Sequence, residues 1–477
     1  MRQIRLFIDG KWREGSNGET LDVINPANEE VIGKLSVATQ EDLGDALNAV
    51  AKGFLVWKNT PASDRARIIH KTADLMRERI DEMALINTIE QGKPVGQSKF
   101  EIMVTANYFD DLADRGVEVN SKEYTPDPIG INRSIQYEPI GPIYASSPWN
   151  LPAMMPGRKI ATALAAGCSI IVKPAEETPE TAAMIAQCCQ DAGLPDGVVN
   201  LVYGSPQMIS DTLIASPIIR KISFTGSTEV GKLLAQMAGT HMKKATLELG
   251  GHAPVIICDD VDVEQVVKTT VPARYANSGQ SCMAATRFFV QEKIYDQFVE
   301  LFTREVKNLQ TGDGTQENTD MGPLANERRL KVLEALVKDA VSQGSRITAG
   351  GNRMSGKGFF FEPTVLVDVP DNANIMTEEP FGPITPIASF QTIDEVIKRA
   401  NATPYGLASY VFSHNQKLAD EISQGLEVGL VGVNSMNVAG PVVPFGGVKD
   451  SGIGREGAMD GIMECLVSKT ISSPVTS

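Results

Sequence analysis

Residues 169–203 read SIIVKPAEETPETAAMIAQCCQDAGLPDGVVNLVY, and this stretch decides the fold class. It begins and ends with short apolar runs, at 170–172 and 198–203, which are typical of buried strands. Between them, Thr178-Pro-Glu offers an N-cap, a proline at the first helical position and an acid in the first turn, and Gly193 ends the predicted helix. Strand, helix and strand in this order predict a βαβ unit.

The same alternation continues on both sides of this unit. Fully apolar strands joined by helices favour a parallel sheet covered on both faces, the doubly wound architecture that commonly binds nucleotides at its strand ends. A second cycle, from about 255 to 450, predicts a second α/β domain. The apolar runs lie at 143–145, 222–224 and 255–257, and the helical patterns of the second cycle lie near 292–310, 326–343 and 392–402.

The N-terminal third shows helical periodicity and one segment of a different kind. Apolar spacing over 43–55 behind Thr39 predicts a capped amphipathic helix. Ser63 could cap a second, long helix that ends at Gly92. Residues 116–138 alternate around a proline-rich turn and predict a protruding hairpin.

Composition limits the class of protein. The chain has 477 residues, enough for two or three domains, and its 42% hydrophobic and 22% charged residues exclude wholesale disorder. Its 44 Lys and Arg against 59 Asp and Glu give a net charge of −15, which argues against nucleic-acid binding. The six cysteines form no C-x-x-C pair, so we expect no metal site and a reducing compartment. No signal-like or membrane-spanning run is found, and we expect a soluble cytoplasmic protein without membrane contact.

A glycine-rich turn lies where a strand should pass into a helix. The sequence from Gly226 to Lys232 nearly matches a P-loop, but Leu233 follows where Mg²⁺ binding needs Ser or Thr, which argues against an NTPase. It is not G-x-G-x-x-G either. Free N–H groups at a helix start still favour an anion, so Gly226 and Ser227 are candidate pyrophosphate ligands, with an ordinary tight turn as the alternative.

One cysteine stands out as a candidate nucleophile. Cys282 is flanked by small and polar residues, whereas Cys168, Cys188 and Cys258 lie in apolar or helical surroundings. Its base could be a histidine, with His252 the nearest to a glycine turn, which would make a Cys/His hydrolase. It could instead be a carboxylate.

The candidate carboxylate is Glu248, inside an apolar run that ends in two glycines. Burial there would raise its pKa towards the range useful for a general base. A carboxylate bonded to backbone amides, and a merely structural Cys282, are the plainer interpretations.

Taken together and in order, the motifs closely resemble those of the NAD(P)-dependent aldehyde dehydrogenase superfamily, and the resemblance covers essentially the whole chain. Within it, the chain looks most like the succinate-semialdehyde dehydrogenase branch. The motifs that carry the resemblance are Pro148-Trp149-Asn150, Lys173-Pro-Ala-Glu176, Phe224-Thr-Gly-Ser227, Glu248-Leu-Gly-Gly251, Gly279-Gln-Ser-Cys282, Glu379-Pro-Phe-Gly-Pro383 and Pro444-Phe-Gly-Gly447.

The resemblance implies the catalytic roles. Cys282 would be the nucleophile that forms a thiohemiacetal and then a thioester, and Glu248 the general base that activates water. The Asn150 amide and the Cys282 N–H would form the oxyanion hole. Ala284 stands where redox-switch members carry a second cysteine, so no local disulfide switch is expected.

The resemblance also implies a nicotinamide cofactor. Because the Glu176 carboxylate can accept from a ribose 2′-OH but would repel a 2′-phosphate, NAD is favoured over NADP. The implied cofactor-binding residues are Lys173 and Glu176 at the adenosine ribose, Gly226 and Ser227 at the pyrophosphate, Glu379 and Phe381 at the nicotinamide riboside, and Trp149.

The substrate is implied less directly. Arg158 could clamp a distal carboxylate in a bidentate way, as a semialdehyde requires, or it could form a structural salt bridge. Ala276 stands where the branch usually has a second arginine, and Ala439 where it tends to have serine. A carboxylated semialdehyde is the first choice, and a neutral aliphatic aldehyde or hydroxyaldehyde is the second. A Cys/His hydrolase and a noncatalytic structural protein are the alternatives from other classes.

The resemblance further implies a division of the chain. Residues 1–117 and 139–250 would form the NAD-binding domain and 251–452 the catalytic domain. Residues 118–138 and 453–477 would form an oligomerisation arm and tail, whose edge strands complete a neighbour's sheet in a homodimer or homotetramer.

Overall fold

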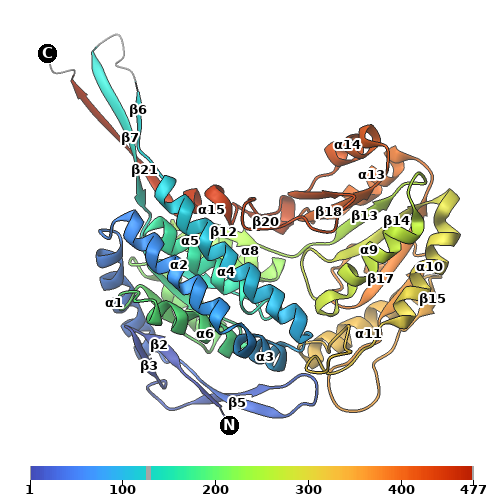
Figure 1. Cartoon of the computed structure of the whole chain (residues 1–477), viewed down its shortest axis with the longest axis horizontal. Coiled ribbons are helices and arrows are strands. Elements are labelled where there is room, and N and C mark those ends of the chain that lie inside the picture. Colours follow the sequence, from blue (N-terminus) through green and yellow to red (C-terminus); the bar gives the residue numbers. More distant parts are fainter. Residues whose placement is uncertain (1, 125–129, 475–477) are drawn as a thin grey trace.

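Two large sheets form the two halves of the molecule, and a slender arm projects from one of them (Figure 1). The computed structural model describes residues 2–124 and 130–474. The first sheet has eight strands, in the order β20 (Gly452–Ile453), β12 (Lys244–Glu248), β11 (Lys221–Thr225), β8 (Ile143–Ser146), β9 (Ile170–Lys173), β10 (Val199–Leu201), β2 (Leu6–Ile8) and β3 (Lys11–Arg13).

The five central strands of this sheet are parallel, as the βαβ pattern predicts. Among these five strands the chain passes first through β8 in the middle, runs outward through β9 and β10, and then returns to the other side of β8 for β11 and β12. The loops after β8 and β11 therefore diverge at a topological switch point, where doubly wound folds bind their ligands. The helices around this sheet are α1 (Gln40–Trp57), α2 (Ala62–Glu78), α3 (Ile80–Gln91), α4 (Val95–Glu118), α5 (Met154–Ala166), α6 (Pro179–Asp191), α7 (Pro206–Ala215), α8 (Thr228–Thr240) and α15 (Ala458–Glu464).

The second sheet has seven strands, all parallel except the edge strand β15. The strand order is β15 (Arg346–Ala349), β16 (Thr364–Val367), β17 (Ile384–Phe390), β14 (Ala285–Gln291), β13 (Ala253–Ile257), β18 (Ala408–Phe412) and β19 (Leu430–Val433). The helices are α9 (Val263–Tyr275), η1 (Ala276–Gly279), η2 (Glu292–Ile294), α10 (Tyr295–Asn308), α11 (Glu327–Ser342), α12 (Asn374–Thr377), α13 (Ile393–Asn401), α14 (Gln416–Gly425) and η3 (Lys449–Ser451). The three helices predicted near 292–310, 326–343 and 392–402 are present as α10, α11 and α13, and the others were not predicted.

Two small sheets complete the fold. One contains β1 (Arg2–Ile4), β5 (Val31–Ser36) and β4 (Thr20–Ile24), and the arm contains β21 (Leu466–Pro474), β7 (Ile131–Pro139) and β6 (Lys122–Tyr124). The arm is an antiparallel hairpin joined by the chain's last strand, as expected, although residues 125–129 of the proline-rich turn lie outside the described residues. The expected tail begins at 453, whereas β20 and α15 pack on the first sheet, so β21 alone joins the arm.

The local helix predictions hold in part. Thr39 caps α1 through a reciprocal capping box with Asp42, and Gly92 ends α3 in the left-handed conformation. The predicted single helix from Ser63 to Gly92 was wrong: α2 starts after Pro61, and the helix breaks at Arg79. The guanidinium of Arg79 pairs with Asp191 of α6 at 2.6 Å, a tertiary contact that the apolar periodicity does not contain.

Helix α6 has a cap that comes from far along the chain. Thr178 is the N-cap residue, but its hydroxyl makes no cap bond. The buried Glu90 carboxylate of α3 instead accepts from the N–H groups of Glu180 and Thr181, at 2.7 and 3.1 Å. Proline and glutamate signals thus located the helix start, while tertiary structure supplies the cap.

A surface histidine ties α2 to α4 in a pH-dependent way. The ring nitrogens of His70 lie 2.7 Å from Asp110 and 3.0 Å from Asp114. Partial burial opposes protonation, but the two carboxylates outweigh it and raise the pKa of His70 above its ordinary value. The bridge therefore contributes its full stability below about pH 6.5, the unfolded pKa, and loses it as pH rises through the folded pKa.

Replacing His70 by glutamine is expected to lower unfolding stability by under about 1 kcal/mol at pH 5.5, because the bridge is partly exposed and screened by solvent. At pH 8.5 the two proteins should be nearly equally stable. Urea unfolding at both pH values measures the difference. An equal loss at both would show that protonation of His70 contributes nothing.

Candidate active site

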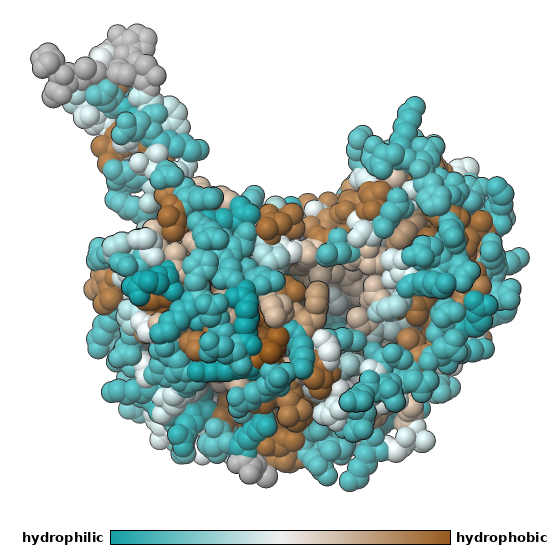
Figure 2. All heavy atoms as spheres, viewed as in Figure 1, coloured by the Kyte–Doolittle hydropathy of each residue, from teal (hydrophilic) through white to brown (hydrophobic). Residues whose placement is uncertain are grey.

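A cleft between the two halves contains most of the residues that the sequence singled out. Figure 2 shows the surface hollowed between two lobes that are mostly covered by hydrophilic residues. A cavity of about 460 Å³ lies between the two sheets. Of the predicted site residues, those that line it are Asn150, Glu248, Cys282, Trp149, Gly226, Ser227, Glu379 and Phe381.

The fold explains this convergence. Trp149 and Asn150 follow β8, Gly226 and Ser227 follow β11, and Glu248 ends β12, so all lie at the carboxyl edge of the first sheet. Cys282 comes just before β14 of the second sheet. The nucleophile candidate and the base candidate therefore come from opposite sides of the cleft.

Two glycines allow the halves to approach closely. A Cβ on Gly251 would lie 2.3 Å from the backbone oxygen of Cys282, and one on Gly446 would lie 3.0 Å from Oε1 of Glu248. Any side chain at Gly251 would push away the loop that carries Cys282, the candidate nucleophile. These contacts give a physical reason for glycine in two of the sequence motifs.

Cys282 is a half-buried thiol beside two carboxyl groups. Burial raises the pKa of the Cys282 thiol to about 12, the carboxyls of Glu379 and Glu248 add to this rise, and Arg158 opposes it. Burial thus favours the protonated thiol, which must lose its proton before it can attack, because the thiolate is the reactive form.

Glu248 is the candidate general base. It is buried, and neither carboxylate oxygen has a hydrogen-bond partner among the described residues. Burial, and then the charge of Glu456, raise the pKa of Glu248 well above its usual value, while Arg158 and Lys159 oppose this rise. A buried carboxylate with unused oxygens is suited to bind a water and to take its proton.

Asn150 is held so that its side-chain amide faces the nucleophile loop. Its Nδ2 donates to the backbone oxygen of Gln280 at 3.0 Å, two residues before Cys282. An amide nitrogen carries two N–H groups, so one remains for an oxyanion. This geometry is consistent with the expected role of Asn150.

The cofactor side of the cavity begins at the start of α8. Ser227 caps this helix by accepting from the N–H of Val230, leaving a positive helix end beside the cleft. Lys232 pairs with Asp450 at 2.6 Å and is mostly exposed, so it does not act as a P-loop lysine. Nearby, Thr225 Oγ1 is buried without a hydrogen-bond partner among the described residues.

Glu379 and Phe381 close the other end. Glu379 accepts from the N–H of Gly251 at 3.0 Å, and burial raises the pKa of Glu379 to about 7 against the effects of that N–H and of Arg329. The ring of Phe381 meets that of Trp149 edge to face, with 5.4 Å between the ring centroids. A flat ring and a carboxyl group at one end, and a helix start at the other, fit a nicotinamide dinucleotide.

Lys173 and Glu176 lie further along the sheet edge and do not line the cavity. The Lys173 ammonium is 2.6 Å from Oε1 of Glu176, which also accepts from the N–H of Gly204 at 3.2 Å. The carboxylate is thus fixed in place, and it neutralises the lysine.

Arg158 forms the structural salt bridge, the alternative that its sequence context left open. It is 1% exposed, its Nη2 lies 2.8 Å from Oε2 of Glu456, and its guanidinium stacks 4.5 Å from the centre of the Phe445 ring. Lys159 binds the other Glu456 oxygen. A substrate carboxylate would have to share this guanidinium with Glu456, so the geometry does not support the expected clamp.

His252 has no catalytic arrangement. Its Nδ1 lies 2.7 Å from the Thr286 hydroxyl and its Nε2 lies 3.0 Å from the Ile375 oxygen, so both nitrogens are engaged away from Cys282. Burial lowers the pKa of His252 well below its usual value. The Cys/His hydrolase interpretation therefore has no geometric support.

The sequence analysis did not predict that α11 contributes side chains to the cavity. Arg328 and Arg329 line the cavity from the first turn of this helix, where positive charge is unfavourable. Arg328 reaches across to Glu177 of the other half at 2.7 Å, and Arg329 donates to the oxygen of Pro380. Two adjacent arginines at the start of a predicted helix were the signal in the sequence that could have identified these residues.

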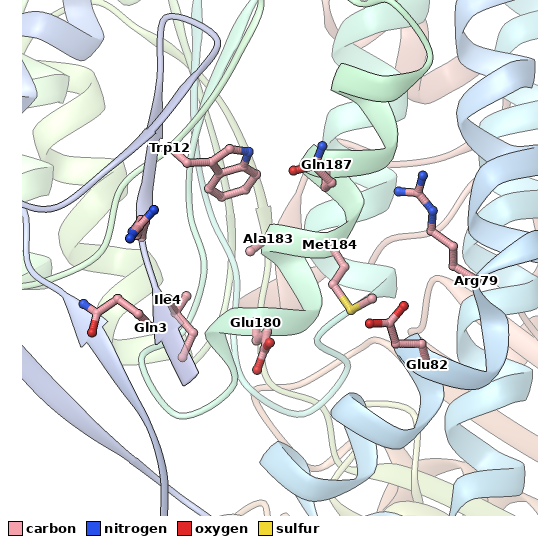
Figure 3. A pocket seen from close by; sticks show the side chains of 10 residues that line it. Gln3, Ile4, Trp12, Arg79, Glu82, Glu180, Ala183, Met184 and Gln187 are labelled. Atoms are coloured by element: carbon pink, nitrogen blue, oxygen red, sulfur yellow. The ribbon is translucent and has the colours of Figure 1, made fainter. Parts of the chain in front are cut away.

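A second hollow, of about 480 Å³, lies on the outer surface (Figure 3). Trp12, Met184 and Glu180 line it, and Arg79 and Glu82 close one side. The charged groups of Glu180 and Arg79 already pair with residues outside the hollow. It is separate from Cys282, and we assign it no chemistry.

The comparisons with known proteins identify the family. The model of the aldehyde dehydrogenase family matches residues 12–471, and the chain belongs to this family. It is an aldehyde dehydrogenase, an oxidoreductase with a small-molecule substrate. The resemblance inferred from the motifs is thereby confirmed.

Its relatives include semialdehyde enzymes. The chain is 40% identical, over 97% of both chains, to a putative 4-(hydroxymethyl)benzenesulfonate dehydrogenase of Comamonas testosteroni. It is 38% identical to succinate-semialdehyde dehydrogenase [NADP(+)] of Escherichia coli K12, over 98% of this chain and 96% of that one. The crystal structure of succinate-semialdehyde dehydrogenase from Burkholderia pseudomallei matches with a TM-score of 0.97 and 39% identity, over 99% of this chain and 98% of that one, which confirms the predicted fold class.

Among the described residues, no helix has both the length and the apolar character that crossing a bilayer requires.

Proposed function

We propose that this enzyme oxidises a carboxylated semialdehyde, such as succinate semialdehyde, to a dicarboxylate, with NAD as the hydride acceptor and a thioester on Cys282 as the intermediate. The observation that carries the proposal is the single cavity that joins Cys282, Glu248 and Asn150 to the start of α8. Relatives named for semialdehydes support the substrate class.

The proposed reaction begins at Cys282. The Cys282 thiol loses its proton to solvent, and the resulting thiolate attacks the aldehyde carbon to form a thiohemiacetal whose oxyanion accepts from the Asn150 amide and the Cys282 N–H. One such donor is worth about 3 to 4 kcal/mol in comparable sites. A bound nicotinamide supplies the acceptor for the hydride that leaves this carbon.

Glu248 acts in the second stage. After loss of the hydride, the acyl group remains on Cys282 as a thioester. Glu248 deprotonates a water that attacks the thioester carbon, the carbon–sulfur bond breaks, and the carboxylate product leaves. The buried, unpartnered oxygens of Glu248 suit it to hold that water.

Glu176 is proposed to set the cofactor preference. The carboxylate, fixed by Lys173 and Gly204, would accept from a ribose 2′-OH and repel a 2′-phosphate. A relative at 38% identity is named for NADP(+), so this preference needs its own test.

Replacing Glu176 by serine is expected to raise kcat/KM for NADP relative to NAD by about tenfold or more, because it removes the repulsion and frees Lys173. Initial rates with both cofactors measure the ratio. Asp211→Asn removes an exposed negative charge on α7, away from the cavity, and serves as the control. Equal shifts in the two variants, or a wild type that prefers NADP, would contradict the assignment.

The substrate class is tested with aldehydes of equal chain length, with and without a terminal carboxylate. We expect kcat/KM to be about tenfold or more higher for the carboxylated aldehyde, a loss typical of one missing charged partner. Equal or better rates with the neutral aldehyde would overturn the semialdehyde assignment. The same ratio of kcat/KM values, measured in Arg158→Met, shows whether the preference depends on Arg158.

A neutral aldehyde is the second candidate, and one observation favours it. The guanidinium of Arg158 is already bonded to Glu456, and Ala276 and Ala439 offer no charge in its place. The same comparison of aldehydes decides between the two.

We further propose that the arm pairs with a second copy of the chain in a homodimer or homotetramer. Strands β21 and β6 are the edge strands of its three-stranded sheet, and β21 is largely exposed. Such edges pair readily with another strand. A monomer at micromolar concentration in light scattering would contradict this assembly.

A further inference from the structure

The backbone oxygen of Asn150 is held from both halves of the molecule. It accepts from the Lys93 ammonium at 2.8 Å and from the Asn277 side-chain amide at 2.8 Å. Lys93 lies between α3 and α4, whereas Asn277 lies in η1, five residues before Cys282. The residue that carries the oxyanion donor is therefore fixed through its main chain.

Lys93 pairs with a buried counter-ion that also binds the turn after β8. Its ammonium lies 2.6 Å from Oε2 of Glu101, and the two side chains are 2% and 3% exposed. The other oxygen of Glu101 accepts from the N–H groups of Ala153 and Met154, at 2.8 and 3.0 Å. The ion pair thus holds the turn after β8 at its carbonyl end and at its amide end.

Stability alone does not explain such a pair. Buried ion pairs can often be replaced by apolar residues of similar volume without loss of stability, because burying the charges is costly. Here Lys93 contacts the main chain of Asn150, and Glu101 contacts the N–H groups of Ala153 and Met154 in the same turn. The contacts of this ion pair with the turn that carries Asn150, rather than a gain in stability, are therefore its distinguishing feature.

We propose that Lys93, with Glu101 as its counter-ion, is a positioning residue for the oxyanion hole. By fixing the Asn150 carbonyl, it keeps the free N–H of the Asn150 side chain aimed at the oxyanion beside Cys282. The inference rests on the proposed function, in which Asn150 stabilises that oxyanion. A displacement of about 1 Å at such a site can cost on the order of 10²-fold in rate.

The test is a double-mutant cycle on the first chemical stage. Lys93→Met, Asn150→Ala and the double variant are compared by the rate of the pre-steady-state NADH burst, with succinate semialdehyde and NAD. We expect Asn150→Ala to slow the burst by about 10²-fold or more, and Lys93→Met by about tenfold or more. The double variant should be no slower than Asn150→Ala, within about threefold, because the two act through one donor.

Two further readouts separate positioning from general damage. Alkylation of Cys282 by iodoacetamide needs no oxyanion hole, so its rate should stay within about twofold of wild type in Lys93→Met. Arg13→Met breaks another ion pair with a buried carboxylate, that of Asp42, away from the cavity. It should lower the melting temperature and leave the burst unchanged.

If Lys93→Met does not fold, Lys93→Gln with Glu101→Gln removes both charges. The shorter amide cannot reach the Asn150 oxygen, so the same slow burst is expected. An unchanged burst in the folded variant, or its full effect persisting on top of Asn150→Ala, would overturn the inference. A wild-type burst in Asn150→Ala would instead refute the proposed function of Asn150 itself.

Discussion

Replacing Cys282 by serine is expected to abolish aldehyde oxidation, with a loss on the order of 10⁴-fold or more in kcat. A serine hydroxyl is far less nucleophilic than a thiolate, and no other described residue that lines the cavity carries a thiol. The loss should appear in kcat, because the substitution removes the atom that forms the covalent bond. The increase in NADH absorbance with succinate semialdehyde and NAD measures it.

Two controls accompany this variant. NAD affinity, measured by calorimetry, should change by less than about twofold, because the side chains at the start of α8 are untouched. Cys258→Ser alters another buried cysteine, just after β13, and should retain most of the activity. Turnover by Cys282→Ser within about tenfold of wild type would remove Cys282 from the mechanism.

Replacing Glu248 by glutamine is expected to separate the two chemical stages. The amide has nearly the same shape, but it cannot take a proton from water, so hydrolysis of the thioester should slow by about 10² to 10⁴-fold. A rapid burst approaching one NADH per active site should then precede a slow steady state. Stopped-flow absorbance records both phases.

The pH dependence of hydrolysis carries the same information. Because the pKa of Glu248 is raised, its basic form increases as pH rises, and wild-type hydrolysis should accelerate with pH until Glu248 is ionised. In Glu248→Gln this dependence should be lost. A steady state close to wild type, or an unaltered pH profile, would show that Glu248 is not the base.

The sequence predicted the architecture because the deciding signals are local. The apolar runs of β8, β9 and β11 and the turn chemistry around α6 each occupy a few consecutive residues, and their alternation defines a doubly wound sheet. The switch point between β8 and β11 then places Asn150 and Ser227 together. Most of the cavity follows from this topology.

What the sequence did not predict depends on contacts between distant residues. Glu90 caps α6 from α3, and Arg79, the residue at which the periodic helix breaks, pairs with Asp191 of α6. Nothing within a few residues of either one encodes these contacts. Periodicity records which face is buried, and it does not record which partner a charged group finds.

Arg158 shows the same limit at the site. Its sequence context fits a carboxylate clamp, and the structure shows that it does bind a carboxylate, that of Glu456, 298 residues away. An arginine at this position predicted a carboxylate partner, but only the fold shows that the partner is Glu456. The paired arginines at the start of α11 likewise acquire their position in the cavity from the packing of the two halves.

Mass spectrometry of the quenched Glu248→Gln enzyme tests the central claim most directly. After mixing with succinate semialdehyde and NAD, the peptide that contains Cys282 should carry one acyl group, bound as a thioester that hydroxylamine removes. Its amount should equal the NADH of the burst. An unmodified Cys282 peptide in the presence of that burst, or an acyl group on another residue, would contradict the account.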